Sequence, residues 1–334
     1  ILLLVHSDLI PPKDVVEKEV NWSKTPWETE YDVKKCLIKA GHKVEILGAY
    51  EELKKIQVAI NEYQPHVVFN LLEEFNGEAI FDQHVVSYLE LLGIPYTGCN
   101  PKGLMIARDK ALSKKILTYH KIPTPKFQTF PKNRRRRGGA LKNFPYIVKC
   151  LNEEASLGIS QASLVYNQEK LFERVDFIHE KFNTSAIAEE FIEGKEYFVG
   201  VLGNHRLETL PVWELRFDKV DDPEMQFYST NAKFDEEYRK RKGIKTQKAN
   251  LPQELEKQLQ KVAKRAFRAL GLSGYARMDL RVDKNGKPYL IEANPNPDIS
   301  EADDFAESAK AMGIQYKDLL NRILNLGKQW TPVK

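Results

Sequence analysis

The stretch GYARMDLRVDKNGKPYLIEANPNPDIS, residues 274–300, carries the strongest structural signal in this chain of 334 residues. Two strand-like runs flank DKNGK at residues 283–287, and an Asn-Gly pair between such runs is typical of a β-hairpin. Pairing of the two strands brings Asp279 and Glu292 together, and Asn294 lies on the same face as Glu292. We therefore expect three oxygen-bearing side chains to converge here.

These three side chains indicate a site for a hard cation. Carboxylate and amide oxygens without histidine or cysteine suit Mg²⁺, which usually completes its coordination shell with nucleotide phosphates. An ordinary charged surface hairpin is the alternative. It fits less well because Asp279 stands between Met278 and Leu280, and a buried carboxylate needs a partner.

Upstream of the hairpin, two lysines stand where phosphate could be bound. Lys110 lies in a lysine-rich helix predicted over residues 108–120, and Lys149 ends the apolar run YIVK. The loop NEEASLG at residues 152–158 follows Lys149, and its small residues, Ser156 among them, can expose backbone N–H groups to phosphate oxygens. Because surface lysines are common and this is not a Walker loop, the pattern is weak evidence by itself.

The run EEFIEGKE, residues 189–196, adds a pattern suited to a nucleoside. It predicts a strand, a short linker and a second strand. A linker of this kind can present a carboxylate or carbonyl to the amino group of adenine and a backbone N–H to its ring nitrogen. Glu196 could then bind the ribose hydroxyls.

The wider pattern predicts an α/β and α+β protein of three units, at residues 1–101, 102–187 and 188–334. The first unit alternates apolar runs (ILLLV, HKVEIL, HVVFNLL, IPYTG) with helices near residues 30–40 and 78–92, which favours a parallel sheet. The second is a small lobe with strands, including ASLVY at 162–166, and a helix at 168–182. The third contains further strands, a helix at 252–270 and a final helix at 308–326.

Composition excludes several classes of protein. No run reaches the ~18 apolar residues that a membrane span needs. ILLLV at residues 1–5 resembles a buried strand more than a signal peptide, so we expect a cytoplasmic protein. Cys36, Cys99 and Cys150 are odd in number and lack a CxxC pair, which favours packing thiols over disulfides or zinc.

Two surface features stay open from the sequence. The net charge of +4 does not require nucleic acid, and the run Arg134 to Arg137 reads as a solvated loop more readily than as a docking site for an acidic partner. The segment 11–26 is a predicted loop. Its Trp22, with Trp27 just after it, would either cover a site or pack onto its own domain.

Taken together, these motifs resemble the ATP-grasp superfamily and, within it, the D-alanine-D-alanine ligases. The resemblance runs through IPYTG (94–98), RDK (108–110), FPYIVK (144–149), ASLG (155–158), EEFIEGKE, the Lys233 of NAKF, YARMD (275–279) and LIEAN (290–294) to the last helix. It implies an N-terminal α/β domain followed by two α+β lobes that clamp ATP. It also implies an ADP-forming ligase that uses an acyl phosphate and two Mg²⁺ ions, with Mn²⁺ as a substitute, and it is compatible with a homodimer.

The resemblance also implies roles for individual residues. Phosphate contacts fall to Lys110, Lys149 and Ser156, and adenine and ribose contacts to Glu189, Ile192 and Glu196. Catalytic roles fall to Lys233 at the terminal phosphate, from a loop over the site, to Arg277 at the transferring phosphoryl group and to Ser156 on a lid loop. The metal ligands would be Asp279, Glu292 and Asn294.

The chain departs from the family pattern on the side of the acceptor substrates. The Gly-Gly-x-Ser-x-Glu element is absent from residues 6–20, NLLEEFNGE at 70–78 replaces a His-Gly segment, and Asp298 replaces a glycine of Thr-x-Pro-Gly-Met. We therefore expect a different small-molecule carboxylate and amine, an amino acid or small peptide, with Glu73, Glu74 or Asp298 near the amine. Simple surface exposure is the alternative for each acid. An authentic D-alanine-D-alanine ligase, a phosphotransferase and a nonenzymatic ATP-binding protein are the alternative functions.

Overall fold

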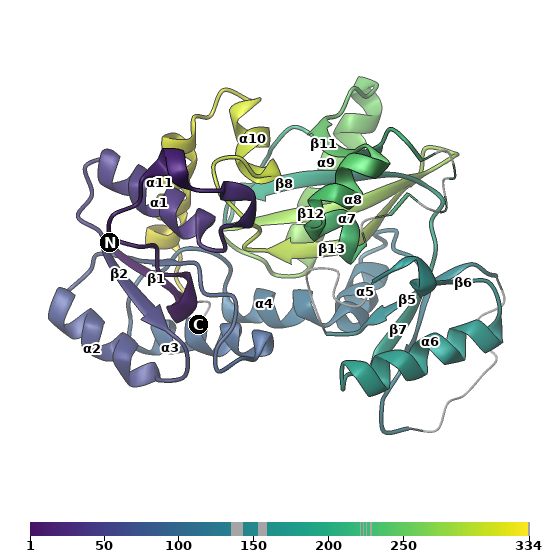
Figure 1. Ribbon diagram of the computed structural model, residues 1–334, viewed down its shortest axis with the longest axis horizontal. Helices are drawn as coiled ribbons and strands as arrows, with labels where there is room; N and C mark the ends of the chain where they lie inside the picture. Colours follow the sequence, from purple (N-terminus) through teal and green to yellow (C-terminus); the bar gives the residue numbers. More distant parts are fainter. Residues whose placement is uncertain are drawn as a thin grey trace.

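Three β-sheets organise the residues that the structure describes, and each sheet is built from a different stretch of the chain (Figure 1). The computed structural model describes residues 1–134, 143–152, 159–220, 222, 224, 226, 227 and 229–332. One sheet is parallel and the other two are antiparallel, which confirms the mixed α/β and α+β class. No helix within these described ranges is long and apolar enough to cross a membrane.

The N-terminal sheet has the order β2-β1-β3, with all pairs parallel. Its central strand has only apolar residues from Leu2 to Val5, and side chains alternate between two cores: Leu2 and Leu4 face one, Leu3 and Val5 the other. IPYTG forms a single bridge, Val68 to Tyr96, and not the strand that its apolar character indicated. The elements are β1 (Leu2–His6), β2 (Glu45–Ala49), β3 (Val68–Asn70), α1 (Glu28–Lys39), α2 (Leu53–Tyr63), α3 (Asp82–Leu91) and α4 (Pro101–Arg108), with 3-10 turns at Ser7–Leu9, Glu17–Glu19, Trp22–Lys24 and Ala79–Phe81.

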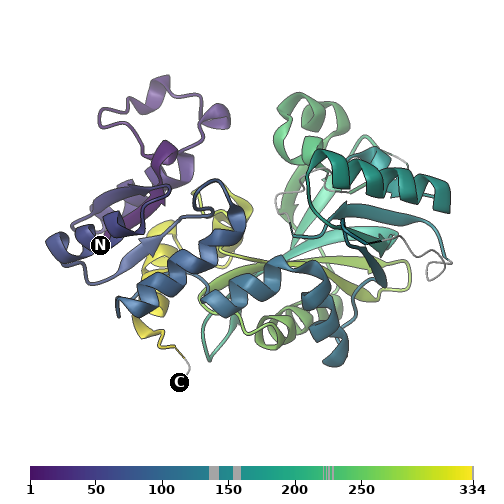
Figure 2. The ribbon, with the colours of Figure 1, turned by 90° about the horizontal axis from the view of Figure 1, so that it is seen from below.

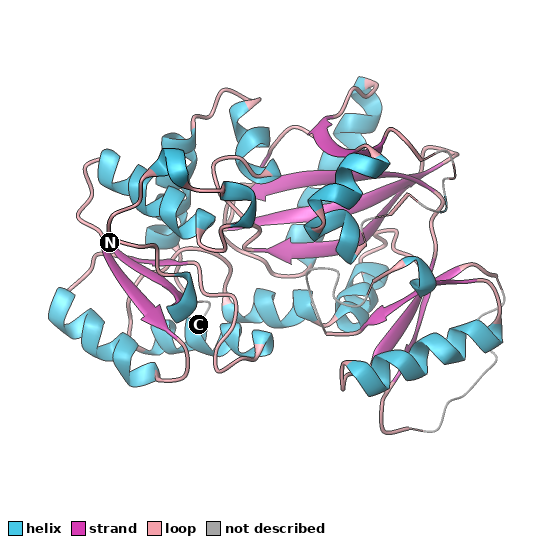
Figure 3. Ribbon diagram, viewed as in Figure 1, coloured by secondary structure: helices cyan, strands magenta, loops and turns pink. Residues whose placement is uncertain are grey.

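A small antiparallel sheet of order β4-β7-β5-β6 is covered on one face by α6 (Gln168–Lys181) and has a hydrophobic cluster of its own (Figures 1 and 3). Its strands are β4 (Phe127–Phe130), β5 (Tyr146–Cys150), β6 (Leu164–Val165) and β7 (Ala186–Glu190). β6 is shorter than predicted because a 3-10 turn, Gln161–Ser163, precedes it. The sheet continues three residues past the expected boundary at residue 187, and the division into three units stays a prediction.

The large sheet has the order β11-β10-β8-β12-β13, with β9 paired to β8 (Figure 3). Strand β11 was not predicted, since its sequence IKTQK is mostly polar. The DKNGK hairpin is confirmed, because β12 and β13 are antiparallel neighbours. The elements are β8 (Gly194–Leu202), β9 (Glu208–Thr209), β10 (Trp213–Phe217), β11 (Ile244–Lys248), β12 (Tyr275–Asp283), β13 (Pro288–Pro295), α7 (Thr230–Phe234), α8 (Glu236–Lys242) and α9 (Gln253–Ala269).

Two predicted helices have different bounds in the structure. The helix expected from residue 108 begins at Lys110 as α5 (Lys110–Tyr119), because the Asp109 side chain accepts the N–H groups of Ala111 and Leu112 as an N-cap. The single final helix expected at 308–326 is wrong. It is two helices, α10 (Asp304–Lys310) and α11 (Tyr316–Gln329), because Gly313 at φ +85° turns the chain between them.

The N-terminal sheet and the large sheet share one hydrophobic core, which holds Leu2 and Ile56 together with Phe267 and Met278. Figure 2 shows the yellow C-terminal segment beside the purple and blue N-terminal elements, and α1 contacts α11. Polar contacts lie at the same junction, and we call them the polar seam. The seam consists of Gly98, Cys99 and Asn100 on one side and Ser273, Gly274 and Asn296 on the other. Asn100 N–H donates to Ser273 Oγ (2.9 Å), and Cys99 N–H donates to Asn296 Oδ1 (2.8 Å). The first and last parts of the chain are thus one packed body.

The tryptophans of the N-terminal loop and the three cysteines can also be placed. Trp22 packs on Trp27 and on Tyr31 of α1, with ring centroids 6.0 and 5.2 Å apart, so the tryptophans pack onto their own domain. Cys36, Cys99 and Cys150 are not joined in disulfide bonds within the described part of the chain, and Cys99 and Cys150 are buried.

Candidate active site

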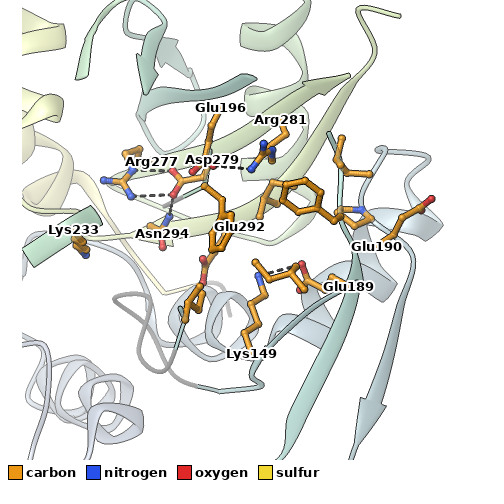
Figure 4. Close-up of a pocket in the computed structure, with 17 residues that line it drawn as sticks. Lys149, Glu189, Glu190, Glu196, Lys233, Arg277, Asp279, Arg281, Glu292 and Asn294 are labelled. Atoms are coloured by element: carbon orange, nitrogen blue, oxygen red, sulfur yellow. Dashed lines mark hydrogen bonds and ion pairs between the residues drawn. The ribbon is translucent and has the colours of Figure 1, made fainter. Parts of the chain in front are cut away.

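The β12/β13 hairpin brings the three predicted metal ligands together. Asp279 and Glu292 are directly opposite in the register, and Arg277 is opposite Asn294. The Asn294 amide donates to Asp279 Oδ2 at 2.9 Å. Figure 4 shows these side chains pointing into one cavity from neighbouring strands.

Cations neutralise both carboxylates of the hairpin. Arg277 binds Asp279 with two parallel bonds, Nε to Oδ1 (2.8 Å) and Nη2 to Oδ2 (3.0 Å), and its guanidinium lies 4.7 Å from the ring centroid of Phe198. Burial raises the pKa of Asp279, and Arg277 opposes that rise. Burial alone would also raise the pKa of Glu292, but Lys110 at 3.1 Å, together with Lys149 and Lys114, holds this pKa at about 2.

A buried group of three charges lies below the hairpin: Lys149, Glu189 and Lys114. Lys149 Nζ is 3.1 Å from Glu189 Oε2, and Lys114 Nζ is 3.4 Å from Glu189 Oε1. Lys114 also donates to the carbonyl of Ile291 at 2.9 Å. Burial lowers the pKa of Lys114 to about 8, although Glu189 opposes the shift. In Lys149 the nearby carboxylates of Glu189 and Glu292 outweigh burial, so its pKa is raised.

Lys114 was missed from the sequence. It follows Lys110 by four residues on α5, so both lysines lie on one helix face, and that spacing was a usable signal. Glu189 was expected at the base and ribose. It lines the cavity, yet each of its carboxylate oxygens is in an ion pair with a lysine.

The cavity has a volume of about 790 Å³ including its open mouth, and it lies between the small sheet and the large sheet. Most of the predicted site residues line it: Lys149, Glu189, Ile192, Glu196, Lys233, Arg277, Asp279, Glu292 and Asn294. Its apolar wall consists of residues that were not singled out from the sequence: Pro125, Ile147, Ile159, Phe191, Phe227 and Ile291. An apolar slot above a charged floor suits a flat base joined to phosphates. Lys233 reaches the cavity from the short helix α7, and not from a loop as expected.

At the far end of the cavity Glu196 pairs with Arg281, with Oε2 3.4 Å from Nη1. Burial raises the pKa of Glu196 to about 7, with Arg281 opposing the shift. Arg281 was also missed from the sequence, where it looked like one more charged residue of a strand.

Four described residues of the prediction do not line the cavity: Lys110, which is linked to it through its ion pair with Glu292, and the three acids Glu73, Glu74 and Asp298. Ser156 lies outside the described residues, as do Arg135, Arg136 and Arg137 of the basic run. Glu73 is exposed, and Glu74 Oε1 is 3.3 Å from His6 Nε2. Asp298 is exposed, and its Oδ1 accepts the Thr29 hydroxyl (2.7 Å) and the Ser300 N–H (2.8 Å).

The donors present fit a magnesium site that needs phosphate to be complete. Asp279, Glu292 and Asn294 supply hard oxygen atoms, and Glu292 stays ionised at every ordinary pH. Within the described ranges no group of three or more His, Cys, Asp or Glu side chains could hold a metal unaided. Two carboxylates and one amide therefore leave coordination positions for nucleotide oxygens.

Comparison with known proteins identifies the family. A family model described as "D-ala D-ala ligase C-terminus" matches residues 116–325. A D-alanine-D-alanine ligase of Aquifex aeolicus is 31% identical over 293 residues, which is 87% of this chain and 92% of that protein. A Sinorhizobium fredii protein described as "Uncharacterized protein y4sG" is 34% identical over 263 residues, 78% of this chain and 74% of its own length.

The solved structures agree. The crystal structure of D-alanine-D-alanine ligase from Bacillus anthracis complexed with ATP has a TM-score of 0.74 and 25% identity, covering 98% of this chain and 96% of that one. The hairpin, the charged floor of the cavity and these matches lead to one conclusion: the chain belongs to the D-alanine-D-alanine ligase family of ATP-grasp enzymes, the ATP-dependent ligases that join a carboxylate to an amine.

Proposed function

We propose that this protein forms an amide or peptide bond between an amino acid or small peptide and an amine, and that two D-alanines are not its substrates. A carboxylate is a poor electrophile, so transfer of the γ-phosphoryl group of ATP first converts it to an acyl phosphate and releases ADP. The amine in its neutral form then attacks the acyl carbon, phosphate leaves, and the nitrogen loses one proton to give the amide. The observation that carries the proposal is the pairing of Asp279 and Glu292 beside Arg277 and Lys149 in one cavity, with Lys110 paired to Glu292.

The proposed catalytic contribution is electrostatic. Two negative groups, the carboxylate and the γ-phosphate, have to approach each other, and this repulsion is a main part of the barrier. Arg277 and Lys233 line the cavity beside the hairpin and offset the charge that develops in the transition state. Two Mg²⁺ ions, or Mn²⁺ in their place, bound by Asp279, Glu292 and Asn294, would polarise the phosphate oxygens.

The nucleotide is proposed to lie across the cavity. Its base would occupy the apolar slot near Phe191, Ile192 and Phe227, its ribose would meet Glu196, and its phosphates would meet Lys110 and Lys149. The lid contact of Ser156 is carried over from the family alone.

The acceptor side is proposed to bind an ammonium group. Glu30 of α1 is 4% exposed, and the nearby acids Glu73 and Asp298 help to raise its pKa. Thr29, the neighbour of Glu30 in sequence, donates its hydroxyl to Asp298. Acids from α1, from the segment after β3 and from the segment after β13 thus lie near one another, which suits a cationic amine. The alternative, an authentic D-alanine-D-alanine ligase, is favoured by the names of several relatives.

The test is a screen of amino acid and dipeptide pairs, with MgATP, for ADP release that requires both substrates. Asp279→Asn and Glu292→Gln are expected to lower kcat by at least about 100-fold, the usual effect of losing a group that stabilises developing charge. Glu254→Gln on the exposed face of α9 is the matched control. Full activity in both hairpin variants would remove the metal assignment.

Three other results of the screen would overturn the proposal. Efficient joining of D-alanine to itself would make the protein an authentic D-alanine-D-alanine ligase. Phosphoryl transfer without an amine would make it a phosphotransferase. ATP binding with no turnover on any pair would favour a nonenzymatic protein. The homodimer is also a proposal, and light scattering of the purified protein measures it.

A further inference from the structure

Arg281 is a buried cation of the cavity for which the proposed reaction has no role so far. It lies on β12 two residues after Asp279 and four after Arg277, so all three side chains project from the same face of the strand. It is 4% exposed. Burying an arginine is expensive unless its donors are bonded, and this residue is therefore expected to have a specific task.

The guanidinium of Arg281 connects separate segments around the nucleotide cavity. Nη1 lies 3.4 Å from Glu196 Oε2, and Nη2 donates to the carbonyls of Gly194 (2.7 Å) and Gln226 (3.1 Å). Its central carbon lies 4.8 Å from the ring centroid of Phe191. Arg281 thus contacts the linker between β7 and β8, the start of β8, and the segment before α7. Figure 4 shows Arg281 and Glu196 beside each other at the edge of the cavity.

The register of β12 with β8 places Arg281 next to Glu196. Arg281 and Glu196 are directly opposite on β12 and β8, so their side chains leave the sheet side by side. Arg281 contacts Oε2 of Glu196, and Oε1 lies outside this ion pair. Glu196 lines the cavity, and this second oxygen is available to accept hydrogen bonds from a ligand.

Arg281 itself is incompletely bonded. Its Nε is buried and has no hydrogen-bond partner within the described parts of the chain. An unmet buried donor on a residue that lines the cavity, beside a carboxylate that also lines it, indicates a site that a polar ligand completes.

We propose that Arg281 is a positioning residue that directs Glu196 toward the hydroxyl groups of a ribose, so that the site selects ribonucleotides over deoxyribonucleotides. The inference rests on the proposed binding of ATP in this cavity. Arginine suits the task because its planar fork holds one carboxylate oxygen and two carbonyls at once, which fixes the direction of the carboxylate. A neutral apolar side chain at residue 281 would leave Glu196 buried without a partner and free to turn away.

The experiment compares the affinities of MgATP and magnesium 2′-deoxyATP, measured by calorimetry without any carboxylate or amine substrate. The wild type is expected to prefer ATP by about 10- to 100-fold, the range for a hydrogen bond to a charged acceptor. Arg281→Met and Glu196→Gln are each expected to lose most of this preference. Their double variant should lose no more than either single variant, because both changes remove the same contact.

The matched control is Arg216→Met. Arg216 forms an arginine-carboxylate pair with Asp218 at the end of β10, its side chain is 46% exposed, and it does not line the cavity. The Arg216→Met variant should keep the preference of the wild type for ATP over 2′-deoxyATP. A merely structural role for Arg281 would weaken both nucleotides equally, so an unchanged ratio in Arg281→Met would overturn the inference. Additive losses in the double variant would overturn it as well.

A conservative variant covers the case in which Arg281→Met does not fold. The ammonium of Arg281→Lys can still face Glu196 but cannot also bond both carbonyls, so an intermediate preference is expected, and the full preference of the wild type would contradict the positioning role. If the wild type binds ATP and 2′-deoxyATP with equal affinity, the proposed ribose contact is wrong, whereas the proposed binding of ATP in the cavity is unaffected. A wild type that takes up no MgATP overturns the proposed function, and with it the inference.

Discussion

Glu30 is a carboxylate whose ionisation should be visible in the stability of the protein. It is buried on α1, and its Oε2 has no hydrogen-bond partner among the residues the structure describes. Burial raises its pKa from 4.5 to about 7, and the charges of Glu73 and Asp298 add to the rise. The folded state therefore holds this proton more tightly than the unfolded chain. The resulting stabilisation is complete below pH 4.5 and is lost as the pH rises through 7.

Glu30→Gln should remove this pH dependence, since the amide does not titrate. Relative to the wild type, the free energy of unfolding of the variant should rise by about 3 kcal/mol between pH 4.5 and pH 8, from a shift of about 2.5 pKa units. Urea denaturation at the two pH values measures it. Glu62→Gln, on an exposed position of α2, should show no such change. An equal effect of Glu30→Gln at both pH values would disprove the assignment.

For individual residues, the sequence predicts a role in the site when the partners of the residue lie close to it in the chain. Asp279, Glu292 and Asn294 could be placed because one hairpin carries all three. Arg281 and Glu196 could not be recognised as a pair, because 85 residues separate them and their contact depends on β8 lying beside β12. The burial of Lys149 against Glu189 depends likewise on the pairing of β5 with β7.

At the scale of the elements, the turn before β12 requires a glycine for two reasons. Gly274 has φ +71°, and a Cβ there would lie 2.4 Å from the carbonyl oxygen of Gly98 across the seam. Gly286 in the hairpin turn has a similar φ of +76° but nothing within 4 Å of an added Cβ. The two glycines thus share the backbone conformation and differ in the space around them.

Gly274→Ala should therefore destabilise the protein more than Gly286→Ala. The left-handed conformation costs an alanine about 1–2 kcal/mol at either position. The contact with backbone at Gly274 adds to that, since overpacking costs about 1–3 kcal/mol. Chemical denaturation of the two variants gives the difference. Equal losses of stability would show that the seam can move apart to admit a methyl group.

Elements with a clear hydrophobic period were predicted from the sequence, and elements defined by tertiary contacts were not. The parallel strand β1 and the amphipathic helix α9 follow from their own residues. In contrast, β11 consists mostly of polar residues and shows no clear hydrophobic period. It is a strand because it pairs with β10. The division between α10 and α11 was missed because apolar residues continue on both sides of Gly313.

For the whole molecule, the cavity lies between two separate sheets, so a bound nucleotide would connect them. Lys149 and Glu189 belong to the small sheet, whereas Glu196 and Asp279 belong to the large one. MgATP at 100 times its Kd should raise the free energy of unfolding by about 2.7 kcal/mol. Thermal denaturation measures the effect. The stabilisation should be much smaller when EDTA removes the metal from the wild type, or when MgATP is added to Glu292→Gln. An equal stabilisation of the wild type by ATP without the metal would argue against the magnesium site.

The sequence predicted three units, but not how they are associated. The small sheet has its own hydrophobic cluster, whereas the first unit shares a core with the large sheet. Contacts such as Gly98 with Gly274 join residues more than 170 positions apart, and no local pattern reports them.

The seam between Cys99, Asn100, Ser273 and Asn296 also limits how this protein can be engineered. Exchange of the first hundred residues for those of a relative is an obvious way to change the acceptor substrate. Backbone N–H groups of the first segment donate to Asn296 and Ser273, so any residue except proline can keep these two bonds if the backbone follows the same path. The side chain of Asn100 is different, because its amide donates to the Gly271 carbonyl (2.8 Å) and to Ser273 Oγ (3.1 Å). A donor segment therefore has to keep the backbone path of residues 98–100 and carry an asparagine at position 100.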